Sequence, residues 1–216
     1  MRIPADWTFE NSDVASSFDE HVREQLPWYD LATGAVAHFA RFYVPRGGLV
    51  YDVGASTGNI GRAIESTLRA RGATLTSIES SVEMAKTWRG PGELVVRDVG
   101  DFQFDHFDFA VAFLVLSFLP LPARELVVAS LATRLRKGGA VVVVDKVEQP
   151  GGHYGSALAA LTLAGKVASG VRAEDVVAKS LSLAGAQRPL RSNWTDGADW
   201  REWWRFGEFA GWLLEG

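Results

Sequence analysis

The sequence predicts an α/β protein built on a doubly wound, mostly parallel β-sheet. Two observations indicate this fold. Between positions 49 and 146, short apolar segments alternate with stretches of helical periodicity, which is the pattern of parallel strands joined by crossover helices. One of these segments, Val141–Val144, contains only valine, as is typical of a strand that is buried on both faces.

The first 45 residues precede this alternation and predict two helices. The first covers Val14–Gln25 with Asp13 as its N-cap, and the second covers Tyr29–Phe42 after a break at Pro27. The apolar face expected on the second helix consists of Leu31, Val36, Phe39 and Ala40, with His38 as a core residue within it. We expect residues 1–45 to form a helical cap within a single domain that spans residues 1–216.

The remaining elements follow from apolar periodicity and from glycine and proline breaks. We expect strands at Leu49–Val53, Thr74–Glu79, Leu94–Arg97, Phe109–Leu114, Ala140–Lys146 and, in the aromatic tail, Trp203–Leu214. We expect helices at Gly58–Ala70, Val82–Trp88, Ala123–Leu135, Tyr154–Ala168 and Ala173–Leu183. Gly138 is expected near the C′ position that ends the helix before the fifth strand.

Composition narrows the classes of function. The chain has 216 residues, a net charge of −4 and no cysteine, which excludes disulfides and thiolate metal ligands and argues against non-specific binding of duplex nucleic acid. No apolar run approaches the roughly 20 residues of a membrane span, so we expect a cytoplasmic protein. The four histidines do not form a metal-binding motif, and we expect no metal; they are His21, His38, His106 and His153.

The turn after the first strand is the most informative segment for function. Gly54 and Gly58 let the backbone approach a ligand closely, and the helix that opens near Gly58 offers unpaired N–H groups. The spacing G-x-x-x-G differs from the G-x-G-x-x-G of dinucleotide enzymes, which disfavours an NAD-dependent oxidoreductase. Asp52 precedes the first glycine and suits a ligand with a positive amino group; alternatively, it caps the turn by accepting from local N–H groups.

Two further carboxylates follow strands. Glu79 ends the second strand, 21 residues after Gly58, where a carboxylate accepts hydrogen bonds from a ribose in doubly wound folds; the alternative is a solvated loop residue. Asp98 follows the third strand and is positioned to accept from an adenine amino group. Residues 113–120 follow the fourth strand and should border the site, because ligands bind beyond the carboxyl ends of parallel strands.

Together these residues resemble the first motif of class I S-adenosylmethionine (SAM) methyltransferases, which reads D-x-G-x-x-x-G. The resemblance implies a seven-stranded, Rossmann-like methyltransferase fold and SAM, or its product S-adenosylhomocysteine, as cofactor. The residues that we expect to bind the cofactor are Tyr29, Asp52, Gly54, Ala55, Ser56, Gly58, Glu79, Ser80, Met84, Asp98, Val99 and Phe113.

Three stretches resemble the carboxy-SAM synthase family, whose members serve tRNA wobble-uridine modification. They are residues 18–29, residues 50–58 with 79–84, and residues 117–119 with 138–146. The resemblance implies that Tyr29 contacts the methionine carboxylate of the cofactor. Two departures stand out: Trp28 replaces a glycine, and the segment Tyr154–Ser169 lacks the arginine with which the family holds the extra carboxylate of its product.

We therefore expect a SAM-dependent methyltransferase that acts on a small or medium-sized acceptor. The alternatives are a carboxy-SAM synthase-like enzyme that acts on SAM itself and a non-catalytic SAM-binding protein. Residues 113–120 lack the D/N-P-P-Y/F signature of amino-methyltransferases, which disfavours nucleobase N-methylation. No catalytic base stands out, although His21 could face the pocket. The aromatic residues of the tail stack a planar substrate, cover a sheet edge or form a homodimer face; they are Trp203, Trp204, Phe206, Phe209 and Trp212.

Overall fold

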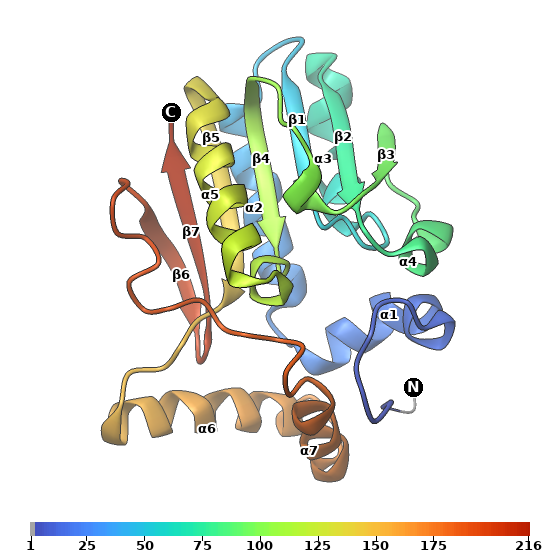
Figure 1. Cartoon of the computed structure of the whole chain (residues 1–216), viewed down its shortest axis with the longest axis vertical. Coiled ribbons are helices and arrows are strands. Elements are labelled where there is room, and N and C mark those ends of the chain that lie inside the picture. Colours follow the sequence, from blue (N-terminus) through green and yellow to red (C-terminus); the bar gives the residue numbers. More distant parts are fainter. Residues whose placement is uncertain (1–2) are drawn as a thin grey trace.

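A computed structural model describes residues 3–216 of the chain. A seven-stranded sheet with the strand order β3-β2-β1-β4-β5-β7-β6 runs through the molecule (Figure 1). The first five strands pair in parallel with one another, and β7 is antiparallel to both β5 and β6. The strands are β1 Leu49–Val53, β2 Thr74–Glu79, β3 Glu93–Val96, β4 Phe107–Phe113, β5 Leu135–Lys146, β6 Arg201–Phe206 and β7 Phe209–Glu215.

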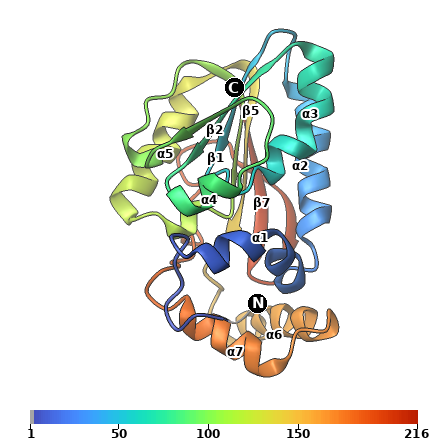
Figure 2. The same cartoon turned by 90° about the vertical axis from the view of Figure 1, so that its right-hand side faces the viewer.

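Helices cover both faces of the sheet, as the doubly wound pattern predicts. In Figure 2, α2 and α3 lie on one face and α5 lies on the other. The helices are α1 Ser12–Gln25, α2 Tyr29–Tyr43, α3 Asn59–Arg71, α4 Val82–Thr87, α5 Leu121–Arg134, α6 Gly152–Ala168 and α7 Ala173–Ser182, with 3-10 turns η1 Val99–Asp101 and η2 Leu116–Phe118. No helix between residues 3 and 216 is both long enough and apolar enough to cross a membrane.

Side chains of strand β5 contribute to two apolar clusters, one on each face of the sheet. Val142 and Val144 belong to the apolar cluster beneath α2 and α3, and Val141 and Val143 belong to the cluster beneath α5. All four side chains are fully buried. The all-valine segment is therefore a central strand buried on both faces, as predicted.

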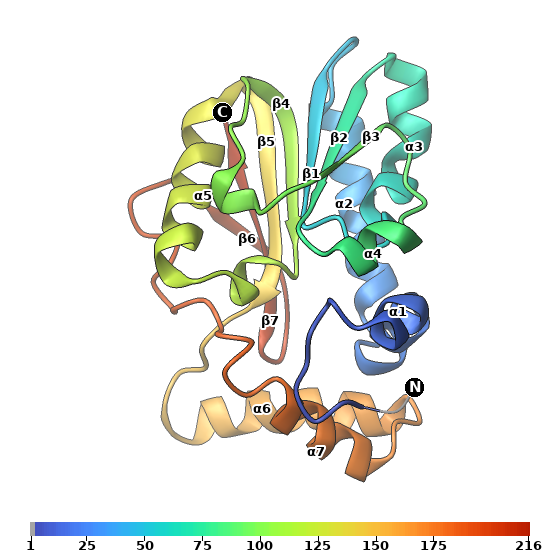
Figure 3. The ribbon, with the colours of Figure 1, turned by 45° about the vertical axis from the view of Figure 1, so that its right-hand side comes forward.

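The carboxyl ends of the parallel strands face a separate layer of helices. Helix α1 lies across these ends, and α6 and α7 lie beyond it (Figures 1 and 3). Helix α2 packs beside α3 on the sheet instead. Within residues 3–45, the part before α2 therefore lies over the carboxyl ends of the strands, and α2 does not. Helices α6 and α7, from the second half of the chain, complete this layer.

Two expectations about the first helices were wrong. Helix α1 is capped by Asn11, whose side-chain oxygen accepts from the backbone N–H groups of Asp13 and Val14. On α2, Leu31 is 70% exposed and His38 is also exposed. The buried face of α2 runs through Ala32, Val36 and Ala40, which places Leu31 and His38 toward solvent on a helix with 3.6 residues per turn.

Two expectations about strands also needed correction. Helix α5 ends at Arg134 and β5 begins at once, so Gly138 is not a helix terminus. With a φ of +81°, it lies in a bulge where the pairing of β4 with β5 shifts register. The aromatic tail forms a hairpin, β6 and β7, rather than one strand. The turn consists of Gly207 and Glu208 alone, and the aromatic residues on both sides of it made the segment resemble one strand.

Candidate functional site

A cavity of about 490 Å³ lies at the carboxyl ends of the strands. Its walls come from the loops after β1, β2, β3 and β4 on one side and from α1, α6, α7 and the segment before α1 on the other. This is the edge at which doubly wound sheets bind ligands. The loop after β4 borders the cavity as predicted, through Phe113 and several residues of 114–120.

The turn between β1 and α3 is a tight backbone cradle. Gly54 and Ser56 have φ values of +69° and +51°, and the Ala55 N–H donates to the Ile78 carbonyl over 2.9 Å. A Cβ added to Gly54 would lie 2.4 Å from Cγ2 of Val115. Position 54 therefore requires glycine for two reasons, its left-handed backbone and the close approach of the loop after β4.

Two residues expected at the cofactor lie behind the cavity wall. Gly58 is the left-handed N-cap of α3, and a Cβ there would lie 2.6 Å from the backbone nitrogen of Gly90. Met84 is fully buried in the first turn of α4. Neither residue lines the cavity, so these two positions shape the loops that form its wall. The other ten predicted residues all line it.

Glu79 joins the loops after β1 and β2. Its Oε2 accepts from the Ser56 N–H over 2.7 Å, and its Oε1 accepts from the Ser81 N–H over 2.8 Å. Burial raises the pKa of the Glu79 carboxyl, and these backbone N–H groups act in the opposite direction. Glu79 is thus a fixed carboxylate in the cavity wall, not a solvated loop residue.

The remaining predicted residues lie around the same cavity. Asp98 is exposed and caps η1, its Oδ1 accepting from the Gly100 N–H over 2.8 Å. Tyr29 is buried at the start of α2 and packs edge-on against Phe113, with 5.3 Å between ring centroids. Burial raises the pKa of the Tyr29 hydroxyl, so this group remains a neutral hydrogen-bonding group at physiological pH.

Asp52 is buried, and one of its two carboxyl oxygens has no hydrogen-bond partner among the described residues. Only 1% of the residue is exposed, and burial raises the pKa of its carboxyl to about 7, opposed by the Gly61 N–H. Within residues 3–216, its Oδ2 has no hydrogen-bond partner, and neither has Oγ of Ser56 on the adjacent loop. Buried polar atoms are normally paired, so both atoms fit a ligand that brings a donor, such as an ammonium group, into the cradle.

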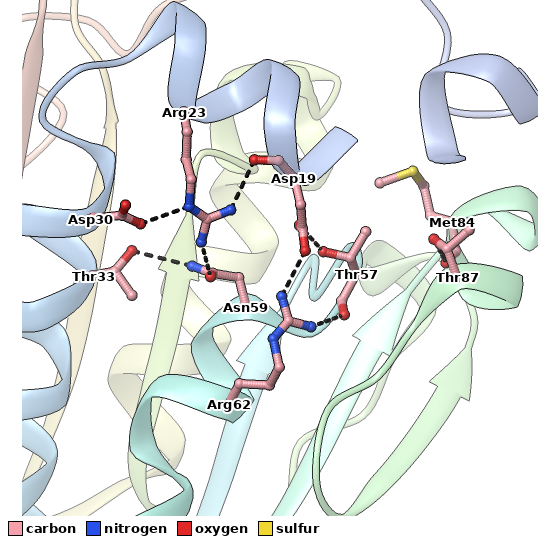
Figure 4. A network of polar contacts seen from close by, with 9 residues as sticks. All are labelled: Asp19, Arg23, Asp30, Thr33, Thr57, Asn59, Arg62, Met84 and Thr87. Atoms are coloured by element: carbon pink, nitrogen blue, oxygen red, sulfur yellow. Dashed lines mark hydrogen bonds and ion pairs between the residues drawn. The ribbon is translucent and has the colours of Figure 1, made fainter. Parts of the chain in front are cut away.

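A polar network attaches α1 to the cradle (Figure 4). The Arg23 side chain donates to Oδ1 of Asn59 over 3.0 Å. The Asp19 carboxylate accepts from Arg62 over 2.9 Å and from the hydroxyl of Thr57. Sequence reasoning missed this network. The four-residue spacing of Asp19 and Arg23 marks one face of α1, but their partners on the cradle and α3 cannot be read from spacing.

The segment before α1 closes one side of the cavity. The backbone N–H of Trp7 donates to the Ser182 carbonyl at the end of α7 over 3.0 Å, and the Ser81 hydroxyl donates to the Phe9 carbonyl over 2.7 Å. The Trp7 indole stacks on His21 at a centroid distance of 5.5 Å. His21 lines the cavity, and burial, followed by the charge of Lys179, lowers its pKa to about 4.

The aromatic tail mainly holds the fold together. Trp204 and Phe209 pack on Trp28, at centroid distances of 4.7 and 4.9 Å, and Trp212 is buried against Trp194. Among the aromatic residues named above from the tail, Phe209 lines the cavity. The tryptophan at position 28 therefore anchors the junction of α1 and α2 to the C-terminal hairpin.

Comparison with known proteins agrees with this geometry. The family described as "Methyltransferase domain" matches residues 51–143. The chain is 29% identical over 192 residues to a carboxy-S-adenosyl-L-methionine synthase of Staphylococcus epidermidis, covering 87% of this chain and 84% of the relative. It is 25% identical over 194 residues to the synthase of the same name from a Shewanella species, covering 86% of this chain and 79% of the relative.

Solved structures share the fold at low sequence identity. Human N-acetylserotonin methyltransferase in complex with SAM aligns with 99% of the chain at a TM-score of 0.60 and 12% identity; the chain spans 60% of the length of that protein. The DhpI–SAM–HEP complex aligns at a TM-score of 0.59 and 18% identity over 95% of this chain and 94% of the other. The chain therefore shares its fold with class I SAM-dependent methyltransferases and is similar in sequence to carboxy-SAM synthases over most of its length.

Proposed function

We propose that this protein transfers a methyl group from SAM to a small or medium-sized acceptor. The observation that carries the proposal is the shared cavity, which is lined on one side by the cradle and on the other by α1, α6 and α7. A volume of about 490 Å³ is in the range of small-molecule sites in proteins. One enclosed space can therefore hold the cofactor beside an acceptor.

The cradle side suits SAM residue by residue. The unpartnered Oδ2 of Asp52 would accept from the ammonium group of the methionine moiety, and Tyr29 would contact its carboxylate. Glu79, fixed by the Ser56 and Ser81 N–H groups, would accept from the ribose hydroxyls. Asp98 and Val99, in the loop after β3, would border the adenine. These assignments are supported by cavity lining and by the unpaired buried atoms.

Catalysis would rest mainly on positioning. Bound SAM supplies a sulfonium methyl carbon that an acceptor lone pair attacks, with the electrons of the carbon–sulfur bond passing to sulfur. The protein holds the cofactor with the cradle and covers it with α1 and residues 7–9. Orientation and exclusion of water are sufficient contributions when the leaving group is already activated. A proton given up by a hydroxyl or amine acceptor would pass to solvent, so the proposal requires no residue of the cavity as a catalytic base.

A carboxy-SAM synthase-like activity is the second candidate. The observation that favours it is the 29% identity to a relative of that name over 87% of the chain. The helix after β5 lacks the arginine implied by the family resemblance, but it carries Lys166, which lines the cavity. A third candidate, a non-catalytic SAM-binding protein, requires only the cradle.

The test is mass spectrometry of reaction mixtures that contain the purified protein, SAM and panels of small hydroxyl, amine and carboxylic acid acceptors. The proposal predicts S-adenosylhomocysteine together with an acceptor that is heavier by one methyl group, and loss of both in the Gly54→Val variant. Carboxy-SAM formation would instead establish the second candidate. SAM binding without turnover for any acceptor would favour the non-catalytic protein.

Three further proposals concern the location of the protein, its oligomeric state and its partners. We infer a cytoplasmic location, a homodimer, and no binding of non-specific duplex nucleic acid. The net charge of −4 supports the last of these. Exposed apolar side chains on the outer helices, including Leu161, Val167 and Leu181, support self-association. Light scattering of the purified protein tests the homodimer, and a monomer at micromolar concentration would contradict it.

A further inference from the structure

Three lysines outside the cradle line the cavity. Lys146 ends β5, Lys166 lies in the last turn of α6, and Lys179 lies on α7. Figures 1 and 3 show α6 and α7 side by side below the carboxyl ends of the sheet. Three successive elements thus bring three lysine side chains to one cavity.

Few carboxylates lie near these three lysines. Nζ of Lys146 lies 3.8 Å from Oε2 of Glu208. Within residues 3–216, neither Lys166 nor Lys179 forms an ion pair. Lys179 is 8% exposed, and its Nζ lies over the ring of Trp7. Lysines are almost never this buried unless they are paired, so this side of the cavity fits an anion.

The electrostatic environment agrees with that geometry. Burial lowers the pKa of Lys179 to about 5, and the charge of Lys166 contributes in the same direction. Burial also lowers the pKa of Lys166, followed by the charge of Lys146, while Glu208 raises it. An anion within a few ångströms favours the charged form of a lysine. A ligand that carries such an anion would therefore be bound together with a proton taken up by Lys179.

We propose that Lys166 and Lys179, with Lys146 beside them, form a subsite that binds the carboxylate group of the methyl acceptor. This inference rests on the proposed function and specifies its substrate class. Apolar side chains line the same cavity, among them Phe9, Phe118 and Leu183, and the Glu208 carboxylate lies beside Lys146. The acceptor is accordingly a carboxylic acid with an apolar body. A single negative charge suits two lysines in an apolar wall better than a dianionic phosphate does.

A matched pair of probes tests the subsite by calorimetry. The protein, saturated with S-adenosylhomocysteine, is titrated with 4-hydroxybenzoate, with its neutral analogue 4-hydroxybenzamide, and with 4-hydroxyphenyl phosphate. We expect the carboxylate to bind at least tenfold more tightly than the amide and more tightly than the phosphate. Equal affinity for the carboxylate and the amide, or failure of the carboxylate to bind, would overturn the proposal. Tighter binding of the phosphate would overturn the assignment of a carboxylate.

Variants identify the residues responsible. Lys166→Gln and Lys179→Gln should each weaken carboxylate binding at least fivefold and leave amide binding within twofold of wild type. Lys137→Gln changes an exposed lysine at the other end of β5 and should change neither. If Lys166 and Lys179 are only structural, their variants will retain the preference of wild type for the carboxylate, which contradicts the proposal.

Proton uptake provides a second readout. At pH 7, carboxylate binding to wild type should take up protons, measured as a dependence of the binding enthalpy on the ionisation enthalpy of the buffer. The Lys179→Gln variant should lose this dependence, and an unchanged dependence would contradict the role of Lys179. SAM titrations of the same variants separate the two proposals. Loss of carboxylate preference with normal SAM affinity concerns the subsite alone, whereas a wild type that does not bind SAM refutes the cofactor assignment itself.

Discussion

The buried carboxyl of Asp52 suits the ammonium group of the proposed cofactor, but its negative charge destabilises the folded protein. Its carboxyl is buried, and burial raises its pKa to about 7. Because the ordinary value is 3.8, the folded protein holds this proton more tightly than the unfolded chain does. The stability that Asp52 contributes is therefore lost as the pH rises from about 4 to about 7. A cationic partner in the cavity would relieve this cost.

The variant Asp52→Asn should separate stability from binding. Asparagine keeps an oxygen for the Gly61 N–H and removes the buried charge. At pH 8 we expect the cofactor-free variant to be at least as stable to urea as wild type, with the difference diminishing toward pH 5, while SAM affinity falls at least tenfold. A variant that binds SAM as tightly as wild type would show that Asp52 does not face the cofactor.

The same carboxyl predicts a pH dependence of SAM binding. The ammonium group of SAM favours the ionised form of Asp52, so SAM affinity should rise between pH 5.5 and 7.5, with a slope that approaches tenfold per pH unit below the pKa. Calorimetry at several pH values measures this slope. The Asp52→Asn variant should have a much shallower profile, and a wild-type profile that is already flat would contradict the assignment.

At the scale of elements, α1 is held in place by polar contacts with the cradle in addition to buried apolar side chains such as Val14 and Val22. Asp19 and Arg62 form an ion pair whose side chains are 42% and 32% exposed, and such partly exposed pairs contribute little to global stability. The sequence predicted the extent of α1 to within two residues because its periodicity is local. It could not predict the partners, because they depend on how α1 meets α3.

The variant Arg62→Ala should loosen α1 without unfolding the protein. We expect faster proteolysis within residues 12–25, a several-fold loss of SAM affinity, and a change in unfolding free energy of no more than about 1 kcal/mol. Arg69→Ala is the matched control, since Arg69 pairs with Glu65 on the same helix and is outside the cavity lining. If both variants behave alike, the network does not hold α1 in place.

At the scale of the molecule, the segments of the parallel sheet could be predicted because most of the strands are apolar runs and breaks or helical stretches separate them. The hairpin of β6 and β7 could not, because its turn is only two residues long, Gly207 and Glu208, and aromatic residues lie on both sides of it. The cradle residues Gly54 and Glu79 carry a recognisable motif. The lysines on α6 and α7 do not, because their function depends on how the chain returns beneath the sheet after β5.

Trp28 shows how distant parts of the chain depend on one another. It is 5% exposed and packs on Trp204 and Phe209 from the C-terminal hairpin. Replacing it by alanine removes a large buried side chain, so we expect a loss of about 3–5 kcal/mol of unfolding free energy in urea. Phe42→Ala removes a side chain from a residue that is 72% exposed and should change stability by less than about 0.5 kcal/mol. Equal effects would contradict this packing role.

The central claim is that the cavity at the carboxyl ends of the strands binds SAM. The most direct measurement is mass spectrometry of the small molecules released from freshly purified protein, followed by calorimetry with added SAM. We predict that SAM or S-adenosylhomocysteine is released, or that the emptied protein takes up SAM with one site per chain. A protein that releases no adenosyl compound and takes up no SAM would contradict the account.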